Sequence, residues 1–182
     1  MAALDADVLV PILTCDLLLT AFDEDLYRPV VTTVILGEVE RNLLAAFPHL
    51  DPVALRGRVA QAADVLSRHT HDVGDIDTAE LAAVNPKDRH VVPAAITNGA
   101  NVIVTNDRRL RREVTAMDRG LVAVTADAFA LQLFADHPDG IDEVITALVA
   151  KRIRRPVTRS ELVDQLAGAL PGFAGELRRR LS

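Results

Sequence analysis

Three acidic residues, Asp5, Asp88 and Asp107, stand where a folded chain would most readily do chemistry, and Glu38 joins them if its helix edge faces the same crevice. Asp5 follows a short apolar segment at the start of the chain, and Asp107 follows the apolar run Val102–Val104. Asp88 lies near the start of an expected helix, and Glu38 lies along one edge of another. In open α/β sheets, ligands bind beyond the carboxyl ends of the strands. These acids therefore mark a candidate site if the chain forms such a sheet.

Gathered carboxylates favour a divalent cation. Like charges at short range and burial both raise carboxyl pKa values, so such a cluster does not stay ionised unaided. Mg²⁺ and Mn²⁺ are hard cations that prefer oxygen ligands. A bound ion lowers the pKa of a water and neutralises phosphate oxygens, which is the chemistry of phosphodiester hydrolysis. Taken singly, Asp88 and Asp107 are equally explained as helix-start residues, favoured by the helix dipole or by capping.

Apolar patterning predicts the elements that would position these acids. The expected strands are Ala2–Leu4, Val102–Val104 and Leu121–Val124, with a connector or very short strand at Arg28–Val31 and a further candidate at His69–Val73. The expected helices, from apolar residues at helical spacing, are Val8–Phe22, Thr33–Phe47, Pro52–Arg68, Asp77–Val84, one opening at Pro86, Arg108–Met117 and one capped by Thr125. Strands alternating with helices imply a parallel sheet covered on both faces. The predicted class is α/β, a three-layer α/β/α sandwich around a central parallel sheet of four to five short strands.

Prolines and a glycine set the expected helix boundaries. Asn85 suits an N-cap, Pro86 suits the first helical position, and Gly99 suits the stop. Pro93 conflicts with this helix, because a proline that far inside is expected to kink it. Pro11 is expected within the first turns of the helix that begins at Val8.

The chain of 182 residues is predicted to form one domain with an appendage. No strand is evident after His137, and two or three helices are expected there, at about Ile141–Lys151, Ser160–Leu170 and Phe173–Leu181. We therefore expect a catalytic domain at residues 1–136 and a helical C-terminal extension at residues 137–182.

Composition limits the class of protein. The net charge of −6 argues against a large basic nucleic-acid face, although it leaves room for a few local arginines. Cys15 is the only cysteine, so an internal disulfide is excluded and a reducing compartment is favoured. We find no signal segment and no apolar run of membrane-spanning length, and we expect a cytoplasmic protein.

Four sequence blocks resemble, in order and spacing, those of the PIN domain, the fold of many metal-dependent ribonucleases, and especially of the VapC-type toxins. The blocks are LDADVL with Asp5, ILGEVERNL with Glu38, NPKDRHVVPAA with Asp88, and VIVTND with Thr105 and Asp107. They lie within residues 2–134. Helical geometry leaves the acid of the second block open between Glu38 and Glu40, which lie on opposite edges of one apolar face, and the resemblance favours Glu38.

The resemblance implies an endoribonuclease acting on single-stranded RNA and activated by Mg²⁺ or Mn²⁺. The acids Asp5, Glu38, Asp88 and Asp107 would hold one or two ions. Thr105 would orient Asp107 or a water, and Asn42, on the same helix edge as Glu38, is a supporting candidate. Asp7 departs from the family pattern, and it either joins the metal shell or caps the first helix.

The resemblance also implies partners for the site. The bases beside the acids in sequence, which would meet substrate phosphates or form a solvated face, are Lys87, Arg89, Arg108, Arg109, Arg111 and Arg112. Proteins of this family are commonly homodimers, and many are inhibited by a small antitoxin protein. We expect both relationships here, and no membrane partner.

Two alternatives stay open. LDADVL also resembles the opening motif of haloacid-dehalogenase-type phosphatases, in which Asp5 would be the nucleophile and Asp7 the general acid. That reading lacks a convincing block for the family's lysine and closing acid pair. The chain is alternatively a PIN-like binding module without turnover.

Other polar residues have simpler explanations. His69 and His71 have the spacing of a metal pair, and His90 follows Asp88 by two residues, but packing, solvent exposure or chance explains all three. Asp127 is explained by the dipole of its helix.

Overall fold

The computed structural model describes residues 1–66, 81, 84–86 and 88–181. The chain divides into two compact units. The first contains Met1–Val10 and Arg28–Val124, and the second contains Pro11–Tyr27 and Thr125–Ser182. No helix within the described ranges is long and apolar enough to span a bilayer. The predicted boundary between residues 136 and 137 stays a prediction.

A four-stranded parallel sheet forms the centre of the first unit, in the order β2-β1-β3-β4. The strands are β1 (Ala2–Leu4), β2 (Pro29–Val30), β3 (Val102–Val104) and β4 (Val122–Val124). Every residue of β1 and β2 is buried, as expected for short apolar strands in a parallel sheet. The predicted strands of this sheet are confirmed, and Arg28–Val31 contains a strand of two residues.

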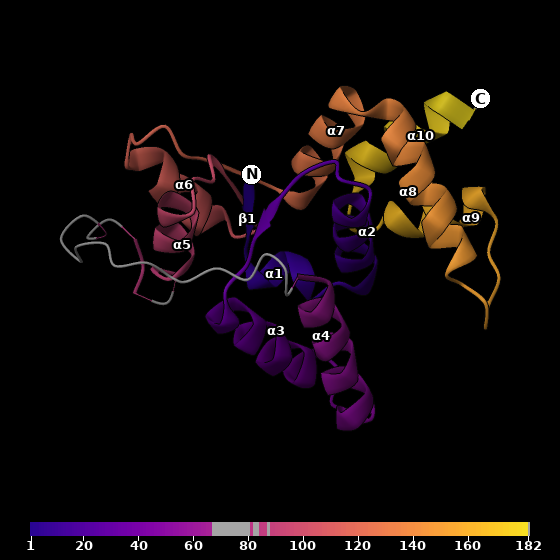
Figure 1. Cartoon of the computed structure of the whole chain (residues 1–182), viewed down its shortest axis with the longest axis horizontal. Helices are drawn as coiled ribbons and strands as arrows, with labels where there is room; N and C mark the ends of the chain where they lie inside the picture. The colour runs from indigo at the N-terminus through magenta and orange to yellow at the C-terminus, as the bar shows by residue number, and fades with distance from the viewer. Residues whose placement is uncertain (67–80, 82–83, 87, 182) are drawn as a thin grey trace. The chain divides into compact units, whose positions relative to one another are not determined.

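The described residues of this unit also form helices, which Figure 1 labels. They are α1 (Ala6–Leu9), α3 (Thr33–Ala46), α4 (Pro52–Leu66), α5 (Val91–Thr97) and α6 (Arg108–Ala116). Helix α5 packs on β1 and β3, α6 packs on β4, and α3 packs on α1 and α4. The predicted α/β class, with a parallel sheet flanked by helices, is confirmed.

The second unit is helical. It consists of α2 (Ile12–Asp23), α7 (Ala126–Asp136), α8 (Pro138–Ala150), α9 (Arg159–Leu166) and α10 (Pro171–Leu181). Helix α2 packs on α8 and α9, and α10 packs on α7 and α9. Phe173, Ile145 and Leu162 are fully buried in this unit. The helices near the C-terminus therefore share one core with a helix from the beginning of the chain.

Asp127 fixes the start of α10. Its carboxylate oxygens accept the backbone N–H groups of Gly172 and Phe173 at 3.0 and 2.9 Å. A Cβ atom at Gly172 would lie 2.8 Å from Asp127 Oδ2, so the close approach needs glycine. The interpretation of Asp127 by its own helix dipole alone is therefore wrong, because its side chain caps another helix.

The predicted helix Val8–Phe22 is wrong as a single element. The chain forms α1 and then α2, and Pro11 stands at the N-cap of α2. Proline has no N–H to bond with the carbonyl of Asp7 one turn earlier, so the helix restarts there.

The helix that carries Val91 starts later than predicted. Asn85 is not its N-cap; residues 88–90 form a turn, and His90 is the N-cap of α5. Pro93 is consequently the third helical residue, where the N–H has no intrahelical partner. This position removes the conflict that Pro93 raised. Gly99 follows the helix with φ +71°, as its predicted stop role requires.

Several predictions lie outside the described residues. They are the strand at His69–Val73, the pair His69 and His71, most of the helix Asp77–Val84, the end of the third helix at Arg68, and the base Lys87.

Candidate active site

The register of the sheet places Asp5 beside Thr105. Leu4 pairs with Val104 in the parallel ladder of β1 and β3, so the next residues of both strands are neighbours at the same edge. The ladder continues for one step, because the backbone N–H of Asp5 donates to the carbonyl of Val104 at 3.0 Å. Two residues a hundred positions apart thus meet at the carboxyl ends of adjacent strands.

The buried hydroxyl of Thr105 connects three acidic residues. It donates to Asp5 Oδ2 at 2.7 Å and lies 3.4 Å from Asp7 Oδ2. Its oxygen also accepts the backbone N–H of Asp107 at 3.1 Å. Thr105 therefore orients Asp5 directly and fixes the backbone of Asp107.

Asp7 holds the loop between β3 and α6. Its Oδ2 accepts the backbone N–H of Asn106 at 2.8 Å, while its buried Oδ1 has no hydrogen-bond partner among the residues that the structure describes. Capping of the first helix, the alternative favoured by sequence position, is performed instead by Asp5, whose Oδ1 accepts the N–H of Ala6 at 2.7 Å.

Asp107 is the N-cap of α6. Its Oδ1 accepts the N–H groups of Arg109 and Leu110 at 2.6 and 3.3 Å. The explanation of Asp107 as a helix cap is therefore correct. Both capping hydrogen bonds use Oδ1, so Oδ2 of this exposed residue takes no part in the cap.

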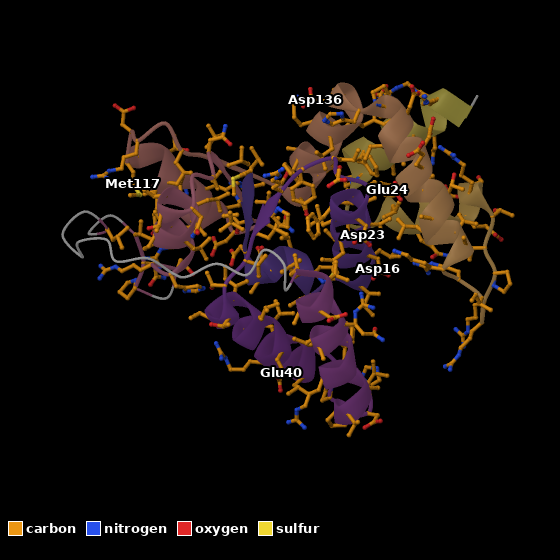
Figure 2. The ribbon with its side chains drawn as sticks, viewed as in Figure 1. Asp16, Asp23, Glu24, Glu40, Met117 and Asp136 are labelled. Carbon is orange, nitrogen blue, oxygen red and sulfur yellow. The ribbon has the colours of Figure 1, made fainter. Side chains whose placement is uncertain are left out.

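Glu38 and Glu40 diverge from α3. Glu38 Oε2 lies 3.0 Å from His90 Nε2, although the angle does not meet hydrogen-bond geometry. Glu40, which Figure 2 labels, instead pairs with Arg56 of α4 at 3.0 Å. Asn42, one turn beyond Glu38, is exposed. The structure therefore separates the two glutamates: Glu38 lies toward the turn that carries Asp88, and Glu40 does not.

Asp88 lies in the turn before α5. A side chain that the sequence analysis did not select fixes this turn: Glu113 of α6 accepts the backbone N–H of Asn85 at 3.0 Å and the Nε–H of Arg109 at 2.6 Å. The spacing of Arg109 and Glu113 indicates an ion pair on one helix face. No sequence signal links Glu113 to Asn85, which lies 28 positions away.

Mutual repulsion joins these acids into one electrostatic cluster. Burial, opposed by the Thr105 hydrogen bond, raises the pKa of Asp5, and the charge of Glu38 raises it further. Burial and then the charge of Asp5 raise the pKa of Asp7 to about 7. Burial raises the pKa of Asp88, and Asp5, Asp107 and Glu113 add to that. Asp5, Glu38, Asp88 and Asp107 therefore each interact electrostatically with at least one other of these acids.

The basic candidates differ in how far their charges are already compensated. Arg109 pairs with Glu113, and the Nε–H of Arg89 donates to the carbonyl of Val84 at 3.0 Å. Arg108 is exposed, and its backbone carbonyl accepts the Nε–H of Arg112 at 3.3 Å.

The donor chemistry of the cluster fits a hard divalent cation. Its candidate ligand atoms are carboxylate oxygens, and within the described ranges Asp7 Oδ1 is buried without a hydrogen-bond partner. Within the described ranges, no three His, Cys, Asp or Glu side chains already surround one point as a ligand set. The assignment of metal ligands stays a prediction.

Comparison with known proteins bears on the family. The family model described as the VapC50 C-terminal domain matches residues 126–179. A relative from Mycobacterium tuberculosis (strain ATCC 25618 / H37Rv), named "Putative ribonuclease VapC50", is 33% identical over 101 residues, which cover 54% of this chain and 60% of the relative. The resemblance to the VapC-like PIN-domain family is confirmed. No solved structure matches the chain.

The VapC-like resemblance reaches both units of the chain. The match to the family model falls on α7–α10, which belong to the helical unit. The matched region, residues 126–179, is thus similar to the VapC50 C-terminal domain. The chain spans about 60% of the length of the VapC50 relative.

Proposed function

We propose that the chain is a divalent-metal-dependent endoribonuclease that cleaves single-stranded RNA, and that it is the toxin of a type II toxin–antitoxin pair in the cytoplasm. The observation that carries the proposal is the Thr105 network, which ties Asp5, Asp7 and Asp107 together where β1 and β3 end. The VapC50 relative, whose name describes a ribonuclease, supports the substrate class.

In this proposal the residues have distinct roles. Asp5, Glu38, Asp88 and Asp107 hold Mg²⁺ or Mn²⁺, which when bound lowers the pKa of a water and neutralises phosphate oxygens. Thr105 keeps the carboxylate of Asp5 oriented through its hydroxyl. Asp7 supports the site by holding the backbone of Asn106.

Cleavage assays with matched glutamate variants test the site. Asp5→Asn, Asp107→Asn and Glu38→Gln are expected to abolish Mn²⁺-dependent cleavage of total RNA while circular dichroism shows an intact fold. Glu40→Gln is the control, since Glu40 lies on the same helix but pairs with Arg56. Undiminished cleavage by Asp5→Asn and Asp107→Asn would exclude the site. Turnover of small phosphomonoesters, lost in Asp5→Asn, would support a phosphatase instead.

The toxin assignment adds protein partners to the proposal. An antitoxin helix needs an apolar surface; Leu50 and Val53, at the α3–α4 connection, and Val34, at the start of α3, are exposed large apolar residues. A short neighbouring reading frame whose product co-purifies with the chain and stops RNA cleavage would support the pair. Sedimentation measures the proposed homodimer directly.

A further inference from the structure

We propose that one face of α6 is a binding subsite for a phosphodiester of the RNA strand, formed by Arg108, Arg111 and Arg112. The subsite deepens the proposed function, because it assigns substrate backbone contacts beside the N-cap residue Asp107. An open pocket of about 320 Å³ lies against this face, lined by the three arginines and Thr115. Its size falls at the lower end of the range typical of small-ligand sites.

Helical spacing brings the lining residues together. Positions 108, 111, 112 and 115 fall within an arc of about 100° at about 100° per residue. The hydroxyl of Thr115 donates to the carbonyl of Arg111 at 2.8 Å. Because its hydroxyl proton is used in this bond, Thr115 only lines the pocket, and the guanidinium groups are the donors available to a ligand. Arg112 also borders a second pocket, of about 290 Å³, on its other side.

The charges of this face are not compensated within the described part of the chain. Arg111 donates Nη1–H to the carbonyl of Thr105 at 3.0 Å, and Arg112 donates to the carbonyl of Arg108; both acceptors are uncharged. No carboxylate partner is seen for these three arginines among the described residues. Arg109, on the neighbouring face, differs because Glu113 neutralises it. A phosphodiester supplies the missing negative charge, and guanidinium groups bind phosphate oxygens in bidentate geometry.

Helix stability does not explain this arrangement. Cations are unfavourable at a helix N-terminus, where the dipole is positive, and Arg108 and Arg112 are like charges one turn apart. A face selected only for solvation would place acids in this first turn. The arginines therefore oppose local folding preferences, as residues selected for binding often do.

Thr105 connects the subsite to the candidate active site. Its hydroxyl bonds to Asp5, while its carbonyl accepts from Arg111. An RNA strand whose phosphate occupies the α6 face therefore lies close to the acids, because the buried residue Thr105 contacts both Arg111 and Asp5. The subsite is expected to position the strand rather than to take part in bond cleavage.

Binding without metal tests the subsite separately from cleavage. Fluorescence anisotropy with a labelled single-stranded RNA in EDTA measures affinity for the wild-type chain, Arg112→Ala, Arg112→Lys and the exposed control Arg119→Ala. We expect Arg112→Ala to weaken binding at least tenfold and to lower the salt slope by about 0.7, the value for one phosphate contact on a single strand. Arg112→Lys is expected to recover part of the affinity, and Arg119→Ala to keep most of it.

Neutral linkages locate the contact. Single methylphosphonate substitutions scanned along the RNA are expected to weaken wild-type binding most at one position, and Arg112→Ala is expected to be insensitive there. The thermal unfolding midpoint of Arg112→Ala should equal that of the wild type or lie slightly above it, whereas a structural role of Arg112 would lower the midpoint. Equal losses in Arg112→Ala and Arg119→Ala, or binding of polyglutamate but not RNA, would overturn the subsite. RNA binding without Mn²⁺-dependent cleavage would overturn only the nuclease proposal.

Discussion

The ionised form of Asp7 is expected to destabilise the folded chain when no divalent cation is present. Burial and the charge of Asp5 raise its pKa from 3.8 to about 7. Below about pH 4 the carboxyl is protonated in the folded and unfolded states alike, and it has no effect. Between about pH 4 and pH 7 the folded state retains a proton that the unfolded state has released. The free energy of unfolding therefore falls as the pH rises through this window, and above pH 7 the loss is complete.

The size of the effect follows from the pKa. A rise from 3.8 to about 7 corresponds to about 4 kcal/mol at 1.36 kcal/mol per pKa unit. Because Asp7 is partly exposed, solvent screening reduces this value, and we expect about 2 kcal/mol. Asp7→Asn keeps an oxygen that accepts the N–H of Asn106 but removes the charge. The variant is thus expected to be more stable than the wild type by about 2 kcal/mol at pH 8, and equal to it at pH 4.

Urea unfolding in EDTA measures this difference. Circular dichroism is the signal, because the chain contains no tryptophan. The exposed carboxylate variant Glu24→Gln gives the baseline for removing one negative charge. A difference between wild type and Asp7→Asn that stays constant from pH 4 to pH 8, or a less stable Asp7→Asn at pH 8, would refute the reasoning.

Three further predictions follow from single contacts. Thr105→Val removes the donor to Asp5 and the acceptor for Asp107, and it should lower the free energy of unfolding by about 1–3 kcal/mol in urea titrations; a Thr105→Ser variant as unstable as Thr105→Val would contradict this role of the hydroxyl. Glu113→Ala frees the turn before Asp88 and should raise the Mn²⁺ concentration for half-maximal cleavage about tenfold, whereas Glu113→Gln keeps the acceptor; identical Mn²⁺ curves for both variants would argue against it. Asp127→Ala uncaps α10 and should cost about 1–2 kcal/mol in thermal or urea unfolding, and an unchanged stability would show the cap to be unimportant.

The elements that position the site were largely predictable from the sequence because short-range patterns specify them. The apolar run Val102–Val104 followed by Thr105 and Asp107 gives a strand and a helix cap, and the structure has both. The boundaries that failed depend on proline. Pro11 separates two helices, and Pro93 is tolerated because its helix begins only at Val91. Sequence spacing alone did not indicate which turn each proline occupies.

Contacts within the site were less predictable, since they depend on strand register. The neighbouring positions of Asp5 and Thr105 follow from the pairing of Leu4 with Val104, which no local pattern encodes. The same holds for Glu113, which reaches Asn85 across 28 positions, and for His90, which lies beside Glu38 rather than in a purely packing role. The sequence indicated which acids are candidates and roughly where they lie in the fold, whereas their hydrogen-bond partners could be identified only from the structure.

The helical unit has a consequence for synthesis of the chain on the ribosome. Helix α2 emerges early, yet its packing partners α8 and α9 begin more than a hundred residues later. Leu17 and Leu18 of α2 are buried in the finished protein, in which α2 packs on α8 and α9. A nascent chain stalled before Pro138 would therefore carry an uncovered apolar helix, vulnerable to aggregation and to chaperone capture, even with every strand of the sheet already made.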